Sequence, residues 1–405
     1  MKNQLIVVSL LDGKGPTGVE THFNQVIDEA RARDIDSMLV SAYPSQRRWA
    51  KVARLLIPLI RLLDKERAEV LSLCINSAVI AAKLAAVLAP EVARNRAVTL
   101  YAQDPVSARI ALQANRHRRC RVVAVIHYNV SQADELRMKG EARTDGPLWR
   151  FIMAAEKESL ARVDHLIFVS TFMQQQIGAR IPAIGAVPQS VIPNVAARCS
   201  ASATNDAIGD VCAPPSGDLI AIGTLEARKN QAFLLQVLAR AKARGYIYSL
   251  TLVGNGPDHA MLVALSVQLG LCEQVRFAGF QKNAARLIAQ HRLLVHAALM
   301  ENMPITLIEA LATGRPILAP AVGGIPEVFS HGVEGYFWPL DDIDGAAGLL
   351  IEALEDADIY RAFAQAALAR YREKFHSDLL VGQWLTTIMQ PRHGAARSTL
   401  AQAMP

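Results

Sequence analysis

The sequence has little cysteine for its length. Its 405 residues include five cysteines, namely Cys74, Cys120, Cys199, Cys212 and Cys272. None belongs to a CxxC pair or to a Cys/His spacing typical of zinc sites, which argues against a zinc-binding module. An odd number of scattered cysteines in a chain of this size favours free thiols in a reducing compartment, so we expect a cytoplasmic protein.

The sequence also lacks a long uninterrupted apolar run and a cleavable signal peptide. Its first apolar run lies within Met1–Leu11 and is followed by Asp12–Gly15, with no small-residue cleavage site. The nearest candidate for a membrane span, Ala78–Pro90, contains Lys83 and is too short to cross a bilayer. We therefore expect a protein that is soluble or peripheral to a membrane rather than integral.

What the sequence does contain is a globular composition with an uneven charge. Hydrophobic residues make up 51% and charged residues 20% of the chain, which argues against disorder of the whole chain, and the length predicts two domains. Residues 1–200 hold 27 Lys or Arg against 18 Asp or Glu, whereas residues 201–405 hold 16 against 19. The net charge of +6 therefore combines +9 in the first half with −3 in the second, which indicates an anionic partner on one side of the molecule.

Short apolar runs alternate with helical patterns in both halves. In the first half the runs predict strands at Leu5–Leu11, Ser37–Ala42, Glu69–Cys74, Val98–Gln103, Val122–Tyr128 and His165–Ser170. In the second half they predict strands at Leu219–Gly223, Ser249–Gly254, Val275–Gly279, Leu293–Ala297, Pro316–Pro320 and Gly335–Trp338. Such runs are typical of strands buried on both faces of a parallel sheet, so we expect two doubly wound α/β domains.

Domain boundaries follow from a break in this pattern. Ala197–Asp218 is small, polar and aperiodic, which predicts a linker or an exposed loop. We expect a first domain over residues 1–197, a linker over 198–217 and a second domain over 218–372. A C-terminal helix over 373–390 is expected to pack back on the first domain, and a flexible tail is expected over 391–405.

The segment Leu299–Glu327 carries the strongest chemical signal. Its carboxylates Glu301 and Glu309 lie eight residues apart. If a helix begins near Pro304, its first turn offers free backbone N–H groups and a positive dipole end, which suit phosphate or a developing anion. The two carboxylates would then accept hydroxyl groups of the same ligand. The spacing fits an ordinary helix with two solvated carboxylates equally well.

Further motifs accompany this segment in a fixed order. Ile222–Asn230 and Leu252–Pro257 precede it, and Gly314-x-Pro316 and Gly323-Gly324-x-Pro326-Glu327 follow Glu309. Together these motifs resemble the family-4 retaining glycosyltransferases of the GT-B fold. The first half is similar more weakly, through Gly15–His22, His127 and Ile192–Asn194. The resemblance implies two Rossmann-like domains facing each other across a cleft, a nucleotide-diphosphate sugar as donor, and no cofactor or metal ion.

The resemblance also implies roles for individual residues. Glu309 would bind the ribose hydroxyls and Glu301 the hydroxyls of the transferred hexose. Arg228 and Lys229 would bind the diphosphate and stabilise its charge as it leaves. The remaining donor-binding positions of the second domain are Gly254, Asn302, Met303, Pro304 and Ile305. Two features depart from the family pattern: Thr224 stands where arginine is common, and Asn302-Met303 replaces a glycine and an aliphatic or aromatic residue.

The first half contributes a glycine-rich loop and a histidine. Asp12–Glu20 fits the GxGxxG expression, but no acidic residue closes a second strand, which argues against a dinucleotide-binding fingerprint. By resemblance the loop covers the donor diphosphate with Gly18 nearest, and His127, at a strand end, approaches the transferred sugar. Glu20 and His22 would contact donor or acceptor, or cap the first helix.

A basic amphipathic stretch accounts for much of the positive charge. Gln46–Arg67 holds seven basic residues against Asp64 and Glu66, is broken near Pro58, and interleaves Trp49 with many aliphatic residues. Such a stretch suits an anionic membrane surface, although an amphipathic helix packed on its own sheet fits equally well. The resemblance favours the membrane, because acceptors in the family are often lipid-linked sugars at the cytoplasmic face.

The leading hypothesis is a retaining hexosyltransferase that uses a UDP- or GDP-sugar and a sugar acceptor in surface polysaccharide or glycolipid assembly. A nucleotide-sugar epimerase of the same fold is the enzymatic alternative. A nucleic-acid-binding module is disfavoured because the basic clusters lack interleaved aromatics other than Trp49. A dehydrogenase is disfavoured because an acidic ribose reader is missing. The sequence leaves open the base, hexose, acceptor, linkage and oligomeric state.

Overall fold

The protein consists of two compact units in a computed structural model of the chain. The structure describes residues 3–15, 17–43, 48–94, 96–196 and 216–391. Unit 1 comprises Met1–Pro193 with Leu380–Pro405, and unit 2 comprises Asn194–Leu379. Each unit has its own parallel sheet and its own hydrophobic core, so the expected pair of doubly wound α/β domains is confirmed.

The sheet of unit 1 contains six parallel strands among the described residues, in the order β2-β1-β3-β4-β5-β6. The strands are β1 (Gln4–Val8), β2 (Asp36–Val40), β3 (Val98–Ala102), β4 (Arg121–Ile126), β5 (His165–Phe168) and β6 (Gln189–Val191). Every residue of β1, β3, β4 and β5 is buried, as expected for strands covered on both faces. The order reverses between β1 and β3, which places a topological switch point there.

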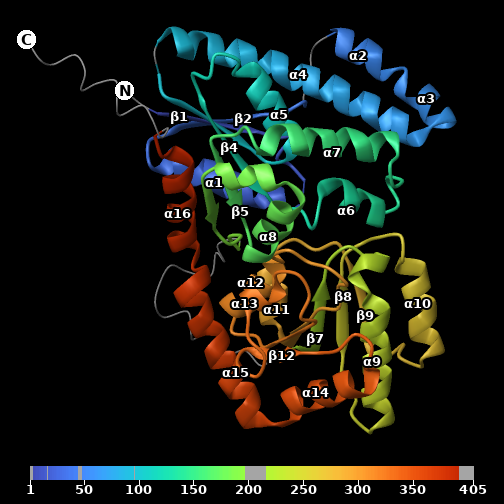
Figure 1. Cartoon of the computed structure of the whole chain (residues 1–405). Coiled ribbons are helices and arrows are strands. Elements are labelled where there is room, and N and C mark those ends of the chain that lie inside the picture. The colour runs from blue at the N-terminus through green and yellow to red at the C-terminus, as the bar shows by residue number, and fades with distance from the viewer. Residues whose placement is uncertain (1–2, 16, 44–47, 95, 197–215, 392–405) are drawn as a thin grey trace, which may run out of the picture. The chain divides into compact units, whose positions relative to one another are not determined.

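Helices connect and cover these strands. They are α1 (Gly18–Ala32), α2 (Arg48–Arg54), α3 (Ile57–Leu63), α4 (Lys65–Ala93), α5 (Pro105–Ala114), α6 (Gln132–Met138), α7 (Pro147–Leu160), α8 (Thr171–Arg180) and η1 (Pro182–Ala186). In Figure 1, α4, α5 and α7 lie on one face of the sheet and α1 lies on the other. Side chains cap several helix starts: Asp104 accepts the Ser107 N–H, and Ser170 accepts the Met173 N–H.

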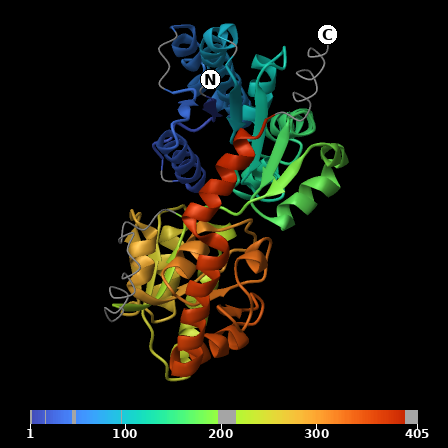
Figure 2. The ribbon, with the colours of Figure 1, turned by 90° about the vertical axis from the view of Figure 1, so that its left-hand side faces the viewer.

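The sheet of unit 2 also contains six parallel strands among the described residues, in the order β12-β11-β10-β7-β8-β9. They are β7 (Gly217–Ile222), β8 (Leu250–Val253), β9 (Val275–Gly279), β10 (His291–Val295), β11 (Ile317–Ala319) and β12 (Gly335–Phe337). Its helices are η3 (Ala227–Lys229), α9 (Gln231–Ala243), α10 (His259–Gln268), α11 (Ala284–Ala289), α12 (Ile305–Ala312), α13 (Ile325–Val328), α14 (Ile343–Glu355), α15 (Ala357–Arg370) and the π-helical η4 (Tyr371–Phe375). Figure 2 shows helices on both sides of these strands.

One predicted strand is wrong. Glu69–Cys74 lies inside α4, a helix of 29 residues. Over only six positions, its aliphatic residues are compatible with a strand or with part of a helix. The length of the whole apolar segment distinguishes the two, because strands are short. Asp64 is the N-cap residue of this helix, and its side chain accepts the Arg67 N–H. The strand β6 was not predicted, because three residues carry too little pattern.

Two smaller expectations also need correction. The predicted linker ends too late, since Gly217 already belongs to β7, and residues 197–215 of the linker lie outside the described residues. The helical stretch that we expected to break near Pro58 breaks earlier, because α2 ends at Arg54. Pro58 lies in the first turn of α3, where the N–H that proline lacks would have no partner in the helix. The expected tail lies outside the described residues from position 392 onward.

By length and composition, α4 could cross a membrane. Its most apolar 18-residue window has a mean hydropathy of 2.0, so the segment Ala78–Pro90, which seemed too short to span a bilayer, belongs to a helix that is long enough. In the structure, Val79, Ile80 and Leu84 of α4 are buried, and α4 packs against α5 and α7. These contacts attach one face of α4 to the core of unit 1, and 28% of its apolar window is buried.

The last described helix, α16 (Ser377–Met389), carries the chain from unit 2 into unit 1. Trp384 is fully buried, and its indole N–H donates to the carbonyl of Pro193 at 3.0 Å. The Trp384 ring also contacts the His22 ring on α1, with centroids 4.3 Å apart. Residues 380–389 therefore complete the core of unit 1 from the far end of the sequence.

Candidate active site

In unit 2 the predicted site residues gather at the topological switch point of the sheet. The strand order turns between β7 and β10, and the loops that follow these two strands leave from the same sheet edge. Ligands of open α/β sheets bind at such points. The loop after β7 carries Arg228 and Lys229, and the loop after β10 carries Glu301. A backbone hydrogen bond from Leu299 N–H to the Arg228 carbonyl, 2.9 Å long, ties the two loops together.

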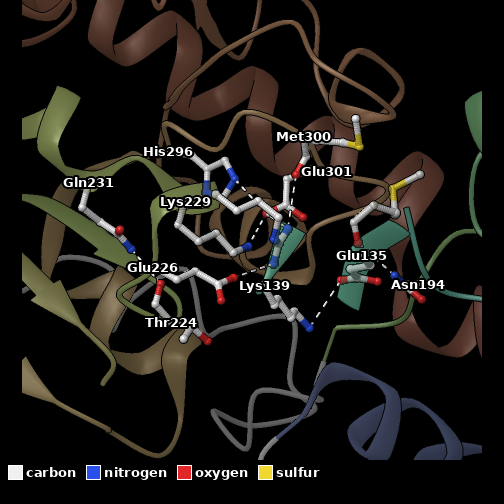
Figure 3. A network of polar contacts seen from close by, with 12 residues as sticks. Glu135, Lys139, Asn194, Thr224, Glu226, Lys229, Gln231, His296, Met300 and Glu301 are labelled. Carbon is white, nitrogen blue, oxygen red and sulfur yellow. Dashed lines mark hydrogen bonds and ion pairs between the residues drawn. The ribbon is translucent and has the colours of Figure 1, made fainter. Parts of the chain in front are cut away.

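Lys229, Glu301 and His296 turn toward one another, as Figure 3 shows. The Lys229 ammonium forms an ion pair and hydrogen bond with Glu301 Oε1. His296 Nε2 lies 3.3 Å from the same oxygen. All three side chains are largely buried. Buried charges are stable only when an opposite charge lies close by. Here the Glu301 carboxylate balances the Lys229 ammonium and also contacts His296.

Arg228 is held by its own contacts beside this cluster. Its guanidinium donates to Glu226 Oε1 at 2.9 Å and to the Met300 carbonyl at 3.3 Å. It also lies 3.9 Å from Glu301 Oε1. Two cations and two carboxylates thus converge at the switch point of unit 2, where each cation already has an anionic partner within the protein.

The electrostatic environment separates the two predicted carboxylates. Burial alone would raise the pKa of Glu301, but Lys229, His296 and Arg228 together hold it well below its ordinary value. Burial also lowers the pKa of His296, against the opposing effect of Glu301. Glu301 is therefore ionised throughout the neutral range, and Lys229 provides the positive charge that balances it.

Glu309 behaves in the opposite way. It lies in the second turn of α12 with 7% of its surface exposed, and no hydrogen bond or ion pair of its carboxyl group is found among the described residues. Burial raises the pKa of Glu309 to about 7. A nearly buried carboxyl group without a protein partner is costly for the free protein, and a ligand that supplies hydroxyl donors would satisfy it.

The first turn of α12 lies between these carboxylates. Pro304 is its N-cap residue, as the sequence predicts, and no side chain caps the helix. Asn302, Met303 and Pro304 are buried, and the Met303 carbonyl accepts a hydrogen bond from Asn194 Nδ2 at 2.9 Å. Asn302 is not among the described residues with positive φ, so the left-handed turn that asparagine could tolerate is not used there.

Two glycines bring the surrounding loops together. Gly254 follows β8 with φ +137°, and a Cβ there would lie 2.0 Å from the Gly223 carbonyl oxygen. Gly323 has φ +58°, and a Cβ there would lie 1.8 Å from the Glu301 carbonyl oxygen. Only glycine permits these approaches. Gly254 thus packs the loop after β8 against the loop that leads to Arg228, and Gly323 fixes the backbone of Glu301.

In unit 1 the predicted His127 directly follows β4, one residue beyond the strand's last position. Its ring lies edge-to-face with that of the fully buried His22, with centroids 4.8 Å apart. His22 Nε2 is 2.8 Å from the Tyr101 hydroxyl. Burial, with a smaller effect of His127, lowers the pKa of His22 well below its ordinary value, so His22 is neutral. His127 therefore lies against the neutral ring of His22, which in turn contacts Tyr101 and Trp384.

The glycine-rich loop of unit 1 is organised by Glu20. Its carboxylate accepts the N–H groups of Gly13 at 3.1 Å and Gly15 at 3.0 Å, and the Thr17 hydroxyl at 2.9 Å. Thr17 in turn accepts the Glu20 N–H with its hydroxyl oxygen and thereby caps the start of α1. The loop amides at 13 and 15 are thus occupied by Glu20. Gly18, the first residue of α1, stays exposed.

The sequence interpretation missed His296 and Glu226. His296 lies inside the run Leu293–Ala297 that predicted β10, so its apolar neighbours indicated a strand residue, whereas β10 ends at Val295. Glu226 lies two residues before Arg228, in the motif Ile222–Asn230, where the sequence interpretation assigned roles only to Arg228 and Lys229. Among the described residues no group of three or more His, Cys, Asp or Glu side chains is arranged to hold a metal ion.

The family of the chain follows from comparison with known proteins. Residues 215–370 match the family model described as glycosyl transferases group 1, and residues 16–195 match the model of glycosyltransferase family 4. The two matches cover every described strand except β1, and both sets of predicted site residues. The resemblance that the motifs indicated is thereby confirmed along most of the chain.

Individual relatives match only part of the chain. N-acetyl-alpha-D-glucosaminyl L-malate synthase of Bacillus anthracis is 36% identical over 137 residues, which are 34% of this chain and 36% of the relative. The phosphatidyl-myo-inositol mannosyltransferase of Mycolicibacterium smegmatis is 32% identical over 155 residues, which are 37% of this chain and 38% of the relative. The chain therefore spans less than two fifths of the length of these two relatives.

Solved structures match nearly the whole chain at low identity. Anabaena Alr3699/HepE in complex with UDP and glucose superposes with a TM-score of 0.67 at 17% identity, over 96% of this chain and 100% of that chain. Sucrose-phosphate synthase from Thermosynechococcus elongatus superposes with a TM-score of 0.67 at 15% identity, over 96% of this chain and 98% of that chain. These structures show that the chain has the GT-B fold, and the two family models, which match residues 16–195 and 215–370, place it among the family 4 glycosyltransferases.

Proposed function

We propose that the protein transfers a hexosyl group, with retention of anomeric configuration, from a nucleotide-diphosphate sugar to a hydroxyl group of a sugar acceptor. The observation that supports the donor most directly is Glu309, a nearly buried carboxyl group without a partner among the described residues. A ribose with two adjacent hydroxyl groups supplies donors of the kind that Glu309 lacks. Glu301, across the first turn of α12, accepts hydroxyl groups of the transferred hexose.

Arg228 and Lys229 stabilise the leaving diphosphate in this proposal. Glycosyl transfer breaks the bond between the anomeric carbon and the diphosphate oxygen, and negative charge develops on that oxygen. Both cations lie at the sheet edge beside α12 and are largely buried, so their charge is little screened. When the donor binds, each cation gives up some of its contact with Glu226 or Glu301 and contacts the diphosphate instead. Because two cations balance the diphosphate charge, no metal ion is required. The acceptor hydroxyl attacks the same face and passes its proton to the departing phosphate, so no enzyme nucleophile is needed.

The relatives support a role in the assembly of glycans or glycolipids. The Mycolicibacterium smegmatis relative is a mannosyltransferase of phosphatidyl-myo-inositol, and an Erwinia amylovora relative, 25% identical over 174 residues, acts in amylovoran biosynthesis. HepE and TarM were solved with UDP. These names favour a nucleoside diphosphate donor and an acceptor at a membrane or in a polysaccharide, and the choice between UDP and GDP belongs to experiment.

Donor turnover followed by NMR tests the proposal. With a mixture of short sugar and lipid-linked acceptors, we expect consumption of one UDP- or GDP-sugar, a new glycosidic anomeric signal of the same configuration as the donor, and unchanged rates in EDTA. Without acceptor, only slow hydrolysis is expected. Conversion of the donor to an epimer without acceptor would instead identify an epimerase. Inversion of the anomeric centre, or loss of activity in EDTA that magnesium restores, would contradict the mechanism.

The second part of the proposal concerns the cytoplasmic face of a membrane. Five leucines in and before α3 are more than half exposed, with Leu62 and Leu63 each at 85%. The five are Leu55, Leu56, Leu59, Leu62 and Leu63. Exposed Arg48, Lys51, Lys65 and Arg67 flank them. An apolar face of this size next to basic side chains suits a lipid surface with anionic headgroups, and would bring the enzyme to a lipid-linked acceptor.

Vesicle flotation tests this membrane surface. We expect the protein to float with vesicles that contain anionic lipid, more weakly with neutral vesicles, and least with the variant Leu62→Gln/Leu63→Gln. The matched control is Met261→Gln/Val267→Gln, which removes two exposed apolar side chains of α10 in unit 2. Equal flotation of both double variants would contradict the assignment of this surface. Nucleotide binding should be the same in all three proteins.

A further inference from the structure

The loop after β4 contains an unusual backbone conformation. Val130 has a φ of +46°. Of the described non-glycine residues with positive φ, it alone has a β-branched side chain. The left-handed region is strongly disfavoured for a β-branched side chain, so surrounding contacts must impose it. The loop leads from His127 to Ser131, the N-cap residue of α6. The strain therefore lies three residues from the predicted sugar-contacting histidine.

The contacts that impose this conformation come from two other helices. Arg180, the last residue of α8, donates from Nη2 to the Val130 carbonyl at 2.8 Å. The same guanidinium forms two hydrogen bonds to Glu156 of α7, one of them 2.8 Å long. The Glu156 carboxylate also accepts the Tyr128 hydroxyl. One buried carboxylate thus anchors the side chain at 128 directly and the backbone at 130 through Arg180.

The charges of this cluster are balanced internally. Glu156 is fully buried, and Arg180 is the cation within hydrogen-bond distance of it. Burial opposes the charge of Arg180, but Glu156 outweighs that effect and raises the pKa of Arg180. Burial and Glu156 raise the pKa of Tyr128 well above its ordinary value, so its hydroxyl stays a donor. The cluster therefore keeps one arrangement of donors and acceptors across the neutral range.

We propose that Arg180, Glu156 and Tyr128 are positioning residues for the transfer reaction, because they hold the strained loop at Val130 and thereby fix His127 against the transferred sugar. The proposal rests on the proposed function for the role of His127. β4 fixes the chain immediately before His127, and the Tyr128–Glu156 bond fixes it immediately after. A cluster that served stability alone would not need to hold a valine in a left-handed conformation two residues further on.

Val130→Gly and Tyr128→Phe test this role in complementary ways. Glycine adopts a positive φ without strain, so Val130→Gly releases the stored strain, keeps the Arg180 bond to the backbone and loosens the loop. Tyr128→Phe keeps the packing and removes one hydrogen bond to Glu156. We expect both variants to fold, to bind donor with KM within about twofold of wild type, and to lose at least about tenfold in kcat.

The matched control is Tyr248→Phe in unit 2. Tyr248 is buried and donates to Glu355 at 3.0 Å, so the change removes the same atom from a tyrosine–glutamate bond, although Glu355 is exposed and Glu156 is not. We expect a loss of thermal stability no larger than that of Tyr128→Phe, and a wild-type kcat. Equal kcat losses in Tyr128→Phe and Tyr248→Phe would overturn the proposal, because they would reflect stability alone.

A second measurement does not depend on turnover. The imidazole Cε1–H resonance of His127, identified by its absence in His127→Gln, should be sharp in wild type and in Tyr248→Phe. It should shift or broaden in Val130→Gly and Tyr128→Phe. An unchanged resonance in both loop variants would overturn the positioning role. If wild type transfers no sugar from any nucleotide donor, the proposed function fails, and this resonance still decides whether the cluster positions His127.

Discussion

At the residue scale the two carboxylates eight positions apart have opposite electrostatic roles. Glu301 lies against Lys229, Arg228 and His296 and stays ionised, whereas Glu309 is buried without a counter-charge among the described residues. The motif placed both residues correctly relative to α12, because the helix start at Pro304 could be read from the sequence. It could not reveal their protonation, because that depends on residues contributed by other loops.

Glu309 makes donor binding pH-dependent. With a pKa of about 7, roughly a tenth of Glu309 is ionised at pH 6 and roughly nine tenths at pH 8. Since the ribose hydroxyls donate to the ionised form, we expect the affinity for a nucleotide sugar to rise up to about tenfold between these pH values. Isothermal titration calorimetry at pH 6 and pH 8 measures this affinity. Glu309→Gln should bind independently of pH, and an equal pH dependence in that variant would contradict the assignment.

Glu309 also affects stability in the absence of donor. Its pKa in the folded protein lies above the ordinary value of 4.5, so ionisation favours the unfolded chain and stability is lost as the pH rises from about 4.5 to about 7. We therefore expect Glu309→Gln to raise the Tm of the free protein at pH 8 and to change it little at pH 4. A lower Tm at pH 8 would show that the carboxylate has a partner in the free protein.

Lys229 and Glu301 form a pair in which each residue needs the other. Lys229→Met leaves a buried carboxylate with only Arg228 and His296 nearby, and removal of one partner from a buried pair costs about 3–5 kcal/mol. The double variant Lys229→Met/Glu301→Gln should recover much of that stability in urea unfolding while transfer activity stays lost. Recovery of activity along with stability would show that the pair has only a structural role.

At the element scale, eleven of the twelve predicted strands are present in the structure, and the one failure has a physical reason. Residues buried on both faces of a parallel sheet give apolar runs of six or seven residues that stand out. Glu69–Cys74 imitated such a run inside a long helix, because α4 is apolar around much of its circumference. The capping residue Asp64 was the local signal that could have corrected the interpretation.

The loops that carry the site depend on close backbone approach. Gly254→Ala would place a methyl group 2.0 Å from the Gly223 carbonyl oxygen at a φ of +137°. We expect a loss of at least about 2 kcal/mol in unfolding free energy. Gly245→Ala is the matched control: its φ is +91°, but no atom lies within 4 Å of its Cβ, so only backbone strain is added. Equal losses in the two variants, measured in urea, would show that the loop contact contributes nothing.

At the scale of the whole molecule, the division of charge between the two halves of the sequence fits the division of tasks that we propose. The slightly acidic second half holds the candidate donor site and needs only the local pair Arg228 and Lys229 for a diphosphate. The first half carries the +9 excess, the exposed leucines of α3 and the His127 loop. The composition could show this asymmetry, but the exposure of the leucines required the structure, since an amphipathic helix packed on its own sheet has the same sequence pattern.

The central claim is that the switch point of unit 2 binds a nucleotide-diphosphate sugar through Glu309. A thermal-shift panel of UDP, GDP, ADP and their sugars, on wild type and Glu309→Ala, tests it most directly. At about 100 times its dissociation constant, a ligand stabilises the folded state by roughly 2.7 kcal/mol. The account predicts that one nucleotide class raises the Tm of wild type and that Glu309→Ala loses most of this shift. No shift with any nucleotide, or an equal shift in Glu309→Ala, would contradict it.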